Sequence, residues 1–308
     1  MTVLVLRALG LGDFLTALPA LRAVRRAHTD ARVLLAAPAA IEPLAMLSAT
    51  VDEVVDVEPL APVPVPEPDI AINLHGCGPQ SHRVLLATRP AKLVAYANPD
   101  VPETNGMPDW SAHEHEVDRW CRLVEGFGMA AERTELSLPS PRREPPGAAV
   151  GATLIHPGAA SGARRWPPER WAAVARAEVA GGRAVAVSAG PSELDLARAV
   201  ATMAGLDEGA VVAGDIIDLA AAVAAARIVV CGDTGVAHMA TAFGTPSVVL
   251  FGPTAPERWG PPAWHPHVAL WAGHEGDPHA ATPDAGLLEI CSAQVIAAVR
   301  MLGRRSLD

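Results

Sequence analysis

The chain has 308 residues, of which 50% are hydrophobic and 19% charged, and its formal net charge at pH 7 is −10. This length is enough for two domains of ordinary size, and the apolar content excludes a chain that is disordered throughout. The acidic balance argues against a general nucleic-acid-binding protein, which needs a basic face. The four cysteines, at 77, 121, 231 and 291, show no CxxC spacing. They are typical of reduced thiols in the cytoplasm rather than of a disulfide framework or a zinc site.

Two features bear on localisation. Residues 1–7 are too short and wrongly flanked for a signal peptide, and no apolar run approaches the ~18 residues of a membrane span. We therefore expect a cytoplasmic protein. Peripheral contact with the inner face of the plasma membrane stays open.

The first half of the chain alternates buried strands with amphipathic helices. Apolar runs predict strands at 3–6, 32–36, 53–57, 69–74 and 92–96. After the first strand, apolar residues from Phe14 to Val24 recur at spacings of three and four and predict one helix, which Pro19 either kinks or delays. Further helices are predicted near 41–47 and 81–87. Another opens at His113-Glu114-His115-Glu116, where the two histidines diverge on a helix and are not expected to share a metal.

Two proline-rich stretches interrupt this alternation. Residues 59–68 contain too many prolines for a helix or a central strand, so we expect an extended surface loop rather than a polyproline ligand. Residues 139–147 have the composition of a linker between domains.

The second half restarts the alternation. Strands are predicted at 152–155, 184–188, 228–230 and 247–251, and helices open at Pro167, after Gly190, at Asp215, after Thr234 and at Ser292. Two alternating halves joined by a linker predict an α/β protein with two Rossmann-like domains and a cleft between them.

Ligands of open parallel sheets bind beyond the carboxyl ends of the strands. Six loops are predicted at such ends: 7–13, 75–78, 156–165, 188–193, 231–238 and 251–260. The stretch from Asp233 to His238 combines a glycine turn with a helix start, which suits a phosphate. The alternative is that Asp233 or Thr234 is only a helix cap and His238 an ordinary helix histidine.

Other parts of the second half also suit a nucleotide. The glycine-containing loop 156–162 and the guanidinium of Arg164 or Arg165 favour a phosphate. Glu193, in the first turn of its helix, could accept hydrogen bonds from ribose hydroxyls, or could simply complement the helix dipole.

The first turn of the chain carries a carboxylate. Gly10-Leu11-Gly12 resembles a dinucleotide fingerprint, but Leu15 stands at the third glycine position, which disfavours an NAD-dependent dehydrogenase. Asp13 could act as a general base on a hydroxyl, or could only cap its helix.

The motifs together resemble glycosyltransferase family 9, the ADP-heptose:lipopolysaccharide heptosyltransferase-like proteins. Four blocks carry the likeness, and a middle helix at 115–119 adds to it. The blocks are 9–13 with 19–22, 156–159 with 165–171, 232–246, and 250–254 with 258–261. The resemblance covers nearly the whole chain.

The resemblance implies a GT-B fold, with two Rossmann-like domains whose parallel sheets face a central cleft. The implied domains are an acceptor domain (1–140), a nucleotide-sugar donor domain (148–290) and a C-terminal helix that returns to the first domain (291–308). It also implies inverting, metal-independent transfer of a sugar from a nucleotide-diphospho-sugar to a hydroxyl of a glycan or glycolipid. The sugar would be heptose or similar, and ADP its carrier. No further cofactor is implied, and the oligomeric state stays open.

The resemblance also assigns residues. Asp13 matches the general base. The donor-binding set comprises Gly12, His156, Gly158, Arg164, Arg165, Glu193, Asp233, Thr234, Gly235 and His238. Arginine stands at 164 and 165, where the heptosyltransferases often have lysine near the diphosphate. The first half has few of the basic residues that a phosphorylated lipopolysaccharide core would require. Two alternatives are a sugar-nucleotide epimerase or hydrolase of similar fold, and a non-catalytic sugar-nucleotide-binding protein.

Overall fold

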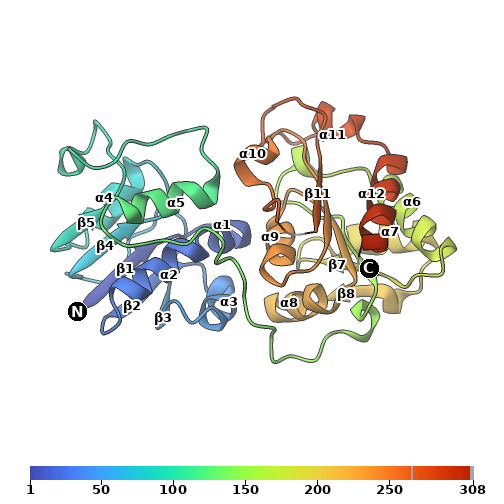
Figure 1. Ribbon diagram of the computed structural model, residues 1–308, viewed down its shortest axis with the longest axis horizontal. Helices are drawn as coiled ribbons and strands as arrows, with labels where there is room; N and C mark the ends of the chain where they lie inside the picture. Colours follow the sequence, from blue (N-terminus) through green and yellow to red (C-terminus); the bar gives the residue numbers. More distant parts are fainter. Residues whose placement is uncertain (265, 306–308) are drawn as a thin grey trace. The chain divides into compact units, whose positions relative to one another are not determined.

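The computed structural model describes residues 1–264 and 266–305. It comprises two compact units, unit 1 (Met1–Leu136) and unit 2, which begins at Ser137 (Figure 1). The predicted linker, 139–147, falls just after this division. No helix in the described residues is both long and apolar enough to cross a bilayer.

Unit 1 is built on a parallel sheet of five strands in the order β3-β2-β1-β4-β5. The strands are β1 (Thr2–Leu6), β2 (Arg32–Ala37), β3 (Glu53–Asp56), β4 (Ile70–Asn73) and β5 (Lys92–Val94). Residues 3–6 of the central strand are buried on both faces, as their continuous apolar run predicts.

Five α-helices accompany this sheet in the described residues. They are α1 (Leu11–Thr16), α2 (Leu18–Ala27), α3 (Glu42–Leu47), α4 (Gln80–Leu86) and α5 (Glu116–Glu125). The single helix expected after β1 is two helices, because Pro19 has no N–H to donate and sits in the first turn of α2, just after the break at Ala17. α2 packs against α5, and the proline-rich segment 59–68 forms no strand or helix, as expected.

Unit 2 is built on a parallel sheet of six strands in the order β11-β10-β9-β6-β7-β8. The strands are β6 (Thr153–His156), β7 (Val185–Ala189), β8 (Val211–Ala213), β9 (Ile228–Gly232), β10 (Ser247–Leu250) and β11 (His267–Leu270). The sequence did not predict β8 and β11. Both are edge strands with partly exposed residues, so neither has the continuous apolar run of a central strand.

Helices cover both faces of this second sheet. They are α6 (Pro168–Ala180), α7 (Leu194–Ala204), α8 (Ile216–Ala225), α9 (Gly235–Ala242), α10 (Pro256–Trp259), α11 (Ala285–Glu289) and α12 (Ser292–Arg305). Figure 1 shows α6, α7 and α12 on one side of the strands and α8 and α9 on the other. Within unit 2, α12 packs against α6, β9 and β10. The return of this segment to the first domain stays a prediction.

Short 3₁₀ helices occupy connections in both units. They are Ala39–Ile41, Pro102–Thr104, Gly147–Ala149, Gly162–Arg164 and Glu208–Ala210. Because every strand pair is parallel, the carboxyl ends of all strands in a unit meet at one edge of its sheet. That edge carries the loops that the sequence singled out.

Candidate functional site

In unit 1 the candidate base, Asp13, lies in the first turn of α1, just beyond the carboxyl end of β1. Its Oδ2 accepts a hydrogen bond from the backbone N–H of Gly10 at 3.2 Å, so the expected capping contact is present. Its side chain nevertheless keeps 28% of its surface exposed. Gly12 lies beside it in the same short helix. The carboxylate is therefore anchored but still accessible to a substrate.

Arg7 holds Asp13 in place. Its Nε donates to the backbone carbonyl of Asp13 at 2.9 Å, and its Nη2 lies 3.4 Å from Oδ1 of the same residue. Nη1 of Arg7 donates to the backbone carbonyl of Leu74, at the end of β4. The arginine side chain is 1% exposed and therefore acts as an internal clamp. Sequence reasoning missed Arg7. A charged residue that directly follows a buried strand is, however, a signal that could have marked it as part of the site.

A second carboxylate, Glu116 at the start of α5, balances the charge of Arg7. Its Oε1 lies 3.0 Å from Arg7 Nη2 and accepts from Trp120 Nε1 at 2.8 Å, and its Oε2 accepts from Arg119. Trp120 also stacks under Arg7, with the guanidinium carbon 4.7 Å from the ring centroid. Burial favours the neutral form of Glu116, but Arg7 and Arg119 outweigh it and hold its pKa below the ordinary value.

The pKa values of the two carboxylates beside Arg7 shift in opposite directions. Burial raises the pKa of Asp13 above its ordinary value; Arg7 opposes this shift, and the nearby negative charge of Glu116 reinforces it. A carboxylate with a raised pKa is a better proton acceptor than an ordinary one. Glu116 is thus a buried partner of Arg7, whereas Asp13 combines a raised pKa with a partly exposed side chain, so it stays the candidate base.

His75 follows β4 at the same sheet edge, and sequence reasoning did not give it a role. Its backbone N–H donates to Asn73 Oδ1 at 2.9 Å, and the backbone carbonyl of the preceding residue, Leu74, accepts from Arg7. Its buried Nδ1 has no hydrogen-bond partner among the described residues. Burial, reinforced by the nearby charge of Arg7, lowers the pKa of His75 to about 4, so the ring is neutral at physiological pH. A rigid backbone therefore presents a neutral imidazole beside the Arg7–Asp13 pair.

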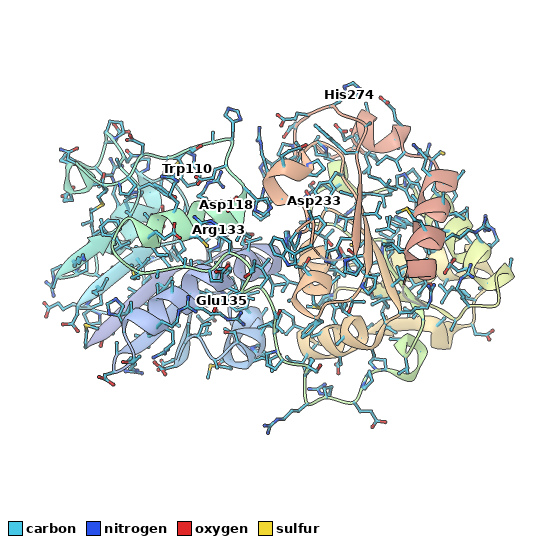
Figure 2. The ribbon with its side chains drawn as sticks, in the orientation of Figure 1. Trp110, Asp118, Arg133, Glu135, Asp233 and His274 are labelled. Atoms are coloured by element: carbon cyan, nitrogen blue, oxygen red, sulfur yellow. The ribbon has the colours of Figure 1, made fainter. Side chains whose placement is uncertain are left out.

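In unit 2, β9 runs directly into α9 through Asp233 and Thr234. Thr234 is the N-cap of α9, and its side chain accepts the N–H of Val236 at 3.3 Å, so of the two caps that the sequence offered as an alternative the structure shows Thr234. Gly235 is the first residue of the helix. Asp233, labelled in Figure 2, is 6% exposed at this junction. The N-terminus of α9 therefore provides backbone donors and the positive end of a helix dipole, which attract an anion.

The structure distinguishes Arg164 from Arg165. Arg164 Nη1 donates to the backbone carbonyl of Asp233 at 3.2 Å and lies 3.9 Å from its Oδ2. Arg165 is exposed, and its Nε donates to the carbonyl of Ala159 at 2.9 Å. A side chain on Gly232 would come within 3.1 Å of the carbonyl oxygen of Arg164, so the glycine permits the close approach of the two segments. Arg164 is thus the guanidinium that lies at the start of α9.

His156, Gly158 and Glu193 form a second cluster at this edge of unit 2. Nε2 of buried His156 lies 3.5 Å from Glu193 Oε2, and its Nδ1 lies 3.1 Å from Ser188 Oγ. Glu193 is the N-cap residue of α7 rather than part of its first turn, and its Oε2 accepts the N–H of Gly190 at 3.0 Å. Burial lowers the pKa of His156, although Glu193 opposes the shift. The cluster thus holds one carboxylate in a defined position.

Gly158 has a steric role in that cluster. A Cβ at this position would lie 2.1 Å from the carboxyl carbon of Glu193. Only glycine therefore lets the carboxylate lie directly against the loop after β6.

His238, the remaining predicted donor-binding residue, is in α9, where its ring packs edge-on against Trp259 with centroids 5.8 Å apart. The predicted donor-binding residues of unit 2 thus come from loops at one edge of its sheet and from α9, whereas Gly12 and Asp13 belong to unit 1.

Comparison with known proteins identifies the family. The family model described as glycosyltransferase family 9 (heptosyltransferase) matches residues 107–283, more than half of the chain. No curated protein matches. Among solved structures, the glycosyl transferase family 9 protein from Veillonella parvula is 19% identical, with a TM-score of 0.76 over 99% of this chain and 97% of that one.

Two E. coli structures are also similar. ADP-heptose lps heptosyltransferase II is 18% identical, with a TM-score of 0.76 and full coverage of both chains. Heptosyltransferase WaaC with ADP is 17% identical, with a TM-score of 0.72 over 98% of this chain and 100% of that one. The expected α/β fold class, with two Rossmann-like parallel sheets of the GT-B type, is thereby confirmed. The chain belongs to glycosyltransferase family 9, the heptosyltransferase family, and is a glycosyltransferase.

Proposed function

We propose that this protein transfers heptose or a similar sugar from an ADP-linked donor to a hydroxyl group of a glycan or glycolipid, with inversion and without a metal ion. The observation that carries the proposal is the meeting of Arg164 with Asp233 at the N-terminus of α9. A guanidinium and a helix N-terminus at one point suit a diphosphate. The similar WaaC structure contains ADP, which supports ADP as the carrier.

In the proposed reaction the hydroxyl oxygen of the acceptor attacks the anomeric carbon of the donor sugar. The new C–O bond forms on the face opposite the diphosphate, the bond from the anomeric carbon to the diphosphate oxygen breaks, and the hydroxyl proton passes to Asp13. Arg164 and the backbone donors at the start of α9 stabilise the negative charge that develops on the leaving diphosphate. The proposal thus assigns proton removal to unit 1 and donor binding to unit 2.

Glu193 is assigned to the ribose of the donor. Its Oε2 is fixed by Gly190 and His156, yet the side chain remains 15% exposed. A carboxylate held in this way can accept hydrogen bonds from two adjacent hydroxyl groups. His156 and Gly158 then act on the donor through Glu193 by fixing its position.

Two experiments test the proposal. In a thermal-shift comparison, ADP at about 100 times its Kd should add roughly 2.7 kcal/mol of stability, and GDP, UDP and dTDP should add less. With ADP-heptose as donor and a panel of glycans and glycolipids as acceptors, NMR should show transfer with inversion that persists in excess EDTA. Turnover of donor alone would favour the epimerase or hydrolase alternative. Nucleotide binding without any turnover would favour a non-catalytic binding protein.

A further inference from the structure

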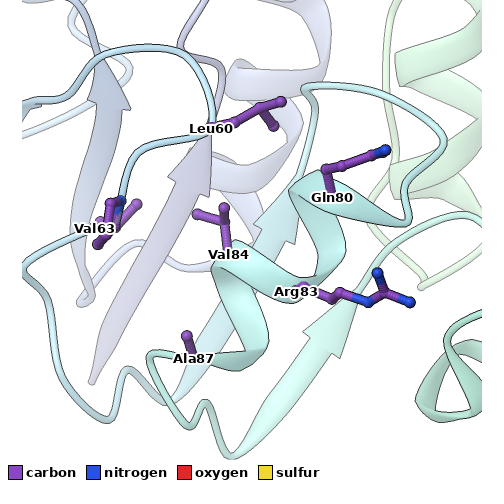
Figure 3. A pocket seen from close by; sticks show the side chains of 7 residues that line it. Leu60, Val63, Gln80, Arg83, Val84 and Ala87 are labelled. Carbon is purple, nitrogen blue, oxygen red and sulfur yellow. The ribbon is translucent and has the colours of Figure 1, made fainter.

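An apolar groove in unit 1 lies between the proline-rich loop after β3 and helix α4. Its volume is about 510 Å³, and Figure 3 shows the two walls facing each other. The groove is lined by Leu60, Pro62, Val63, Gln80, Arg83, Val84 and Ala87. Its hydrocarbon surface is therefore aliphatic, and the polar groups come from Gln80 and Arg83.

The groove continues past the end of α4. A second hollow of about 220 Å³ shares Val63 and Ala87 with the first and extends to Thr88 and Arg89. At about 1.5 Å per residue, the helical part of this wall, Gln80–Leu86, is roughly 10 Å long, and residues 87–89 extend it beyond the helix. The occupant that fits such a channel is long and thin.

One end of the groove lies at the carboxyl edge of the sheet, the edge that also carries the candidate base. Leu60 and Gln80 lie at the end toward which the strands point in Figure 3, which is the carboxyl edge of the sheet. Next to Gln80, Ser81 Oγ accepts from Asn73 Nδ2 at 2.9 Å. Asn73 in turn holds the backbone of His75, whose preceding carbonyl binds Arg7. A short run of hydrogen bonds therefore connects the rim of the groove to the residue that holds Asp13.

Leu60 itself is unusual at that rim. It is 43% exposed and has a φ of 61°, a left-handed conformation that is rare for a leucine. Such conformations are unfavourable by about 1–3 kcal/mol and cluster at sites of function. An exposed leucine held in this way adds apolar surface to the mouth of the groove.

The charges of unit 1 favour an uncharged occupant. Most of its arginines contact carboxylates within 4 Å: Arg7, Arg25, Arg26, Arg32, Arg89, Arg119, Arg122 and Arg133. These contacts neutralise the guanidinium charges, so a multiply phosphorylated acceptor gains little attraction from this unit. Two cationic residues line the groove: Arg83 donates to the carbonyl of Asp100 at 3.3 Å, and Arg89 pairs with Glu67 at 2.8 Å.

We propose that this groove binds the alkyl chain of a glycolipid acceptor, whose sugar hydroxyl is thereby presented to Asp13. The inference rests on the proposed transfer reaction and names the class of its acceptor. An alkyl chain is favoured over an aromatic group because the apolar lining consists of leucine, valine, proline and alanine side chains. Burial of a chain against these side chains supplies affinity in proportion to the number of methylenes covered.

The test uses methyl, hexyl and octyl β-glucoside as probes, below their micelle-forming concentrations, with the full-length protein. Binding is followed by NMR on labelled Leu and Val methyl groups. Each fully buried methylene should strengthen binding about fourfold, so the octyl probe should bind at least about tenfold more tightly than the methyl probe. Phenyl β-glucoside tests the aromatic alternative, and its binding more tightly than the octyl probe would overturn the alkyl-chain assignment.

Ala87→Asp is the informative variant, because Ala87 is exposed and its replacement leaves the core intact. Val84→Asp, at a half-buried position, is a second variant. Met46→Asp is the matched control, since Met46 is 46% exposed in α3 and does not line the groove. The first two should abolish the advantage of the octyl probe, and the control should keep it. Equal binding of all chain lengths, or an unchanged advantage in Ala87→Asp, would overturn the proposal.

A thermal shift with ADP in the same samples separates the proposal that the groove binds an alkyl chain from the proposal that unit 2 binds an ADP-linked donor. An intact ADP shift without chain-length dependence overturns the groove assignment alone. Chain-length dependence without an ADP shift overturns the donor assignment and leaves the groove as an alkyl-binding site.

Discussion

Arg7 and Glu116 are 109 residues apart in the sequence and form an ion pair of 3.0 Å in the interior of unit 1. Both side chains are at most 6% exposed. Because Arg7 also binds Asp13 and the end of β4, this pair fixes the geometry around the candidate base. The first prediction concerns its removal.

Glu116→Ala should lower the free energy of unfolding of unit 1 by about 3–5 kcal/mol, because it removes the nearer of the two carboxylates that pair with the buried Arg7 and also the partner of buried Arg119. Hydrogen exchange of the amides in β1 and β4 measures this loss within unit 1. Glu53→Ala is the control, since its ion pair with Arg32 is exposed and should contribute about 1 kcal/mol or less. Equal losses of stability in Glu116→Ala and Glu53→Ala would contradict the structural importance of the buried Arg7–Glu116 pair.

The same pair predicts a pH dependence of stability. The pKa of Glu116 is held below its ordinary value of 4.5, so its contribution is fully present above pH 4.5 and is lost as the pH falls through the lower folded-state pKa. In Glu116→Gln this acid-sensitive component should disappear. Exchange rates of β1 amides in the wild type and the variant, compared between neutral and acidic pH, measure it.

Asp13→Asn should abolish most transfer but retain ADP binding. Asparagine keeps the oxygen that accepts the Gly10 N–H but cannot take a proton from the acceptor. Because the pKa of Asp13 is raised, the ionised carboxylate destabilises the fold at neutral pH, so the variant should be as stable as the wild type or more so. In the wild type, transfer should increase as the pH rises through this raised pKa. Full transfer activity in Asp13→Asn would remove Asp13 as the base.

Gly158→Ala should displace the Glu193 carboxylate, because the added Cβ would overlap it. We expect ADP affinity to fall about tenfold, and the preference for ADP over 2′-deoxy-ADP to disappear, since the lost contact is to the ribose. Isothermal titration with both nucleotides measures this. Gly147→Ala is the control, because a Cβ there meets nothing within 4 Å, and it should bind both nucleotides as the wild type does.

Arg164→Ala should weaken ADP binding about 10- to 100-fold, the range expected for a hydrogen bond to a charged group. Arg165→Ala should weaken it much less, because that side chain contacts the carbonyl of Ala159. The two variants form a matched pair at neighbouring positions and are compared by isothermal titration with ADP and with AMP. A larger loss of ADP affinity in Arg165→Ala than in Arg164→Ala would make Arg165, and not Arg164, the arginine that contacts the diphosphate.

The sequence determined much of the fold because its signals are local. Continuous apolar runs marked the central strands, and the step from strand to helix marked Asp233 or Thr234 as a cap, although only the structure chose Thr234. Pro19 marked the discontinuity between α1 and α2, although not its form. The edge strands β8 and β11 were missed because their pairing with β7 and β10 supplies an order that their short, half-exposed sequences do not signal.

For the candidate site, the sequence by itself determined which loops come to the carboxyl ends of the strands, because parallel βα alternation forces them there. Only the tertiary structure decided which side chains meet. The choice of Arg164 over Arg165 depends on the approach of the segment around residue 164 to Asp233. The clamp of Arg7 on Asp13 depends on Glu116, brought in by α5 from more than one hundred residues away. Such contacts depend on how elements pack around a shared core, and no local periodicity encodes them.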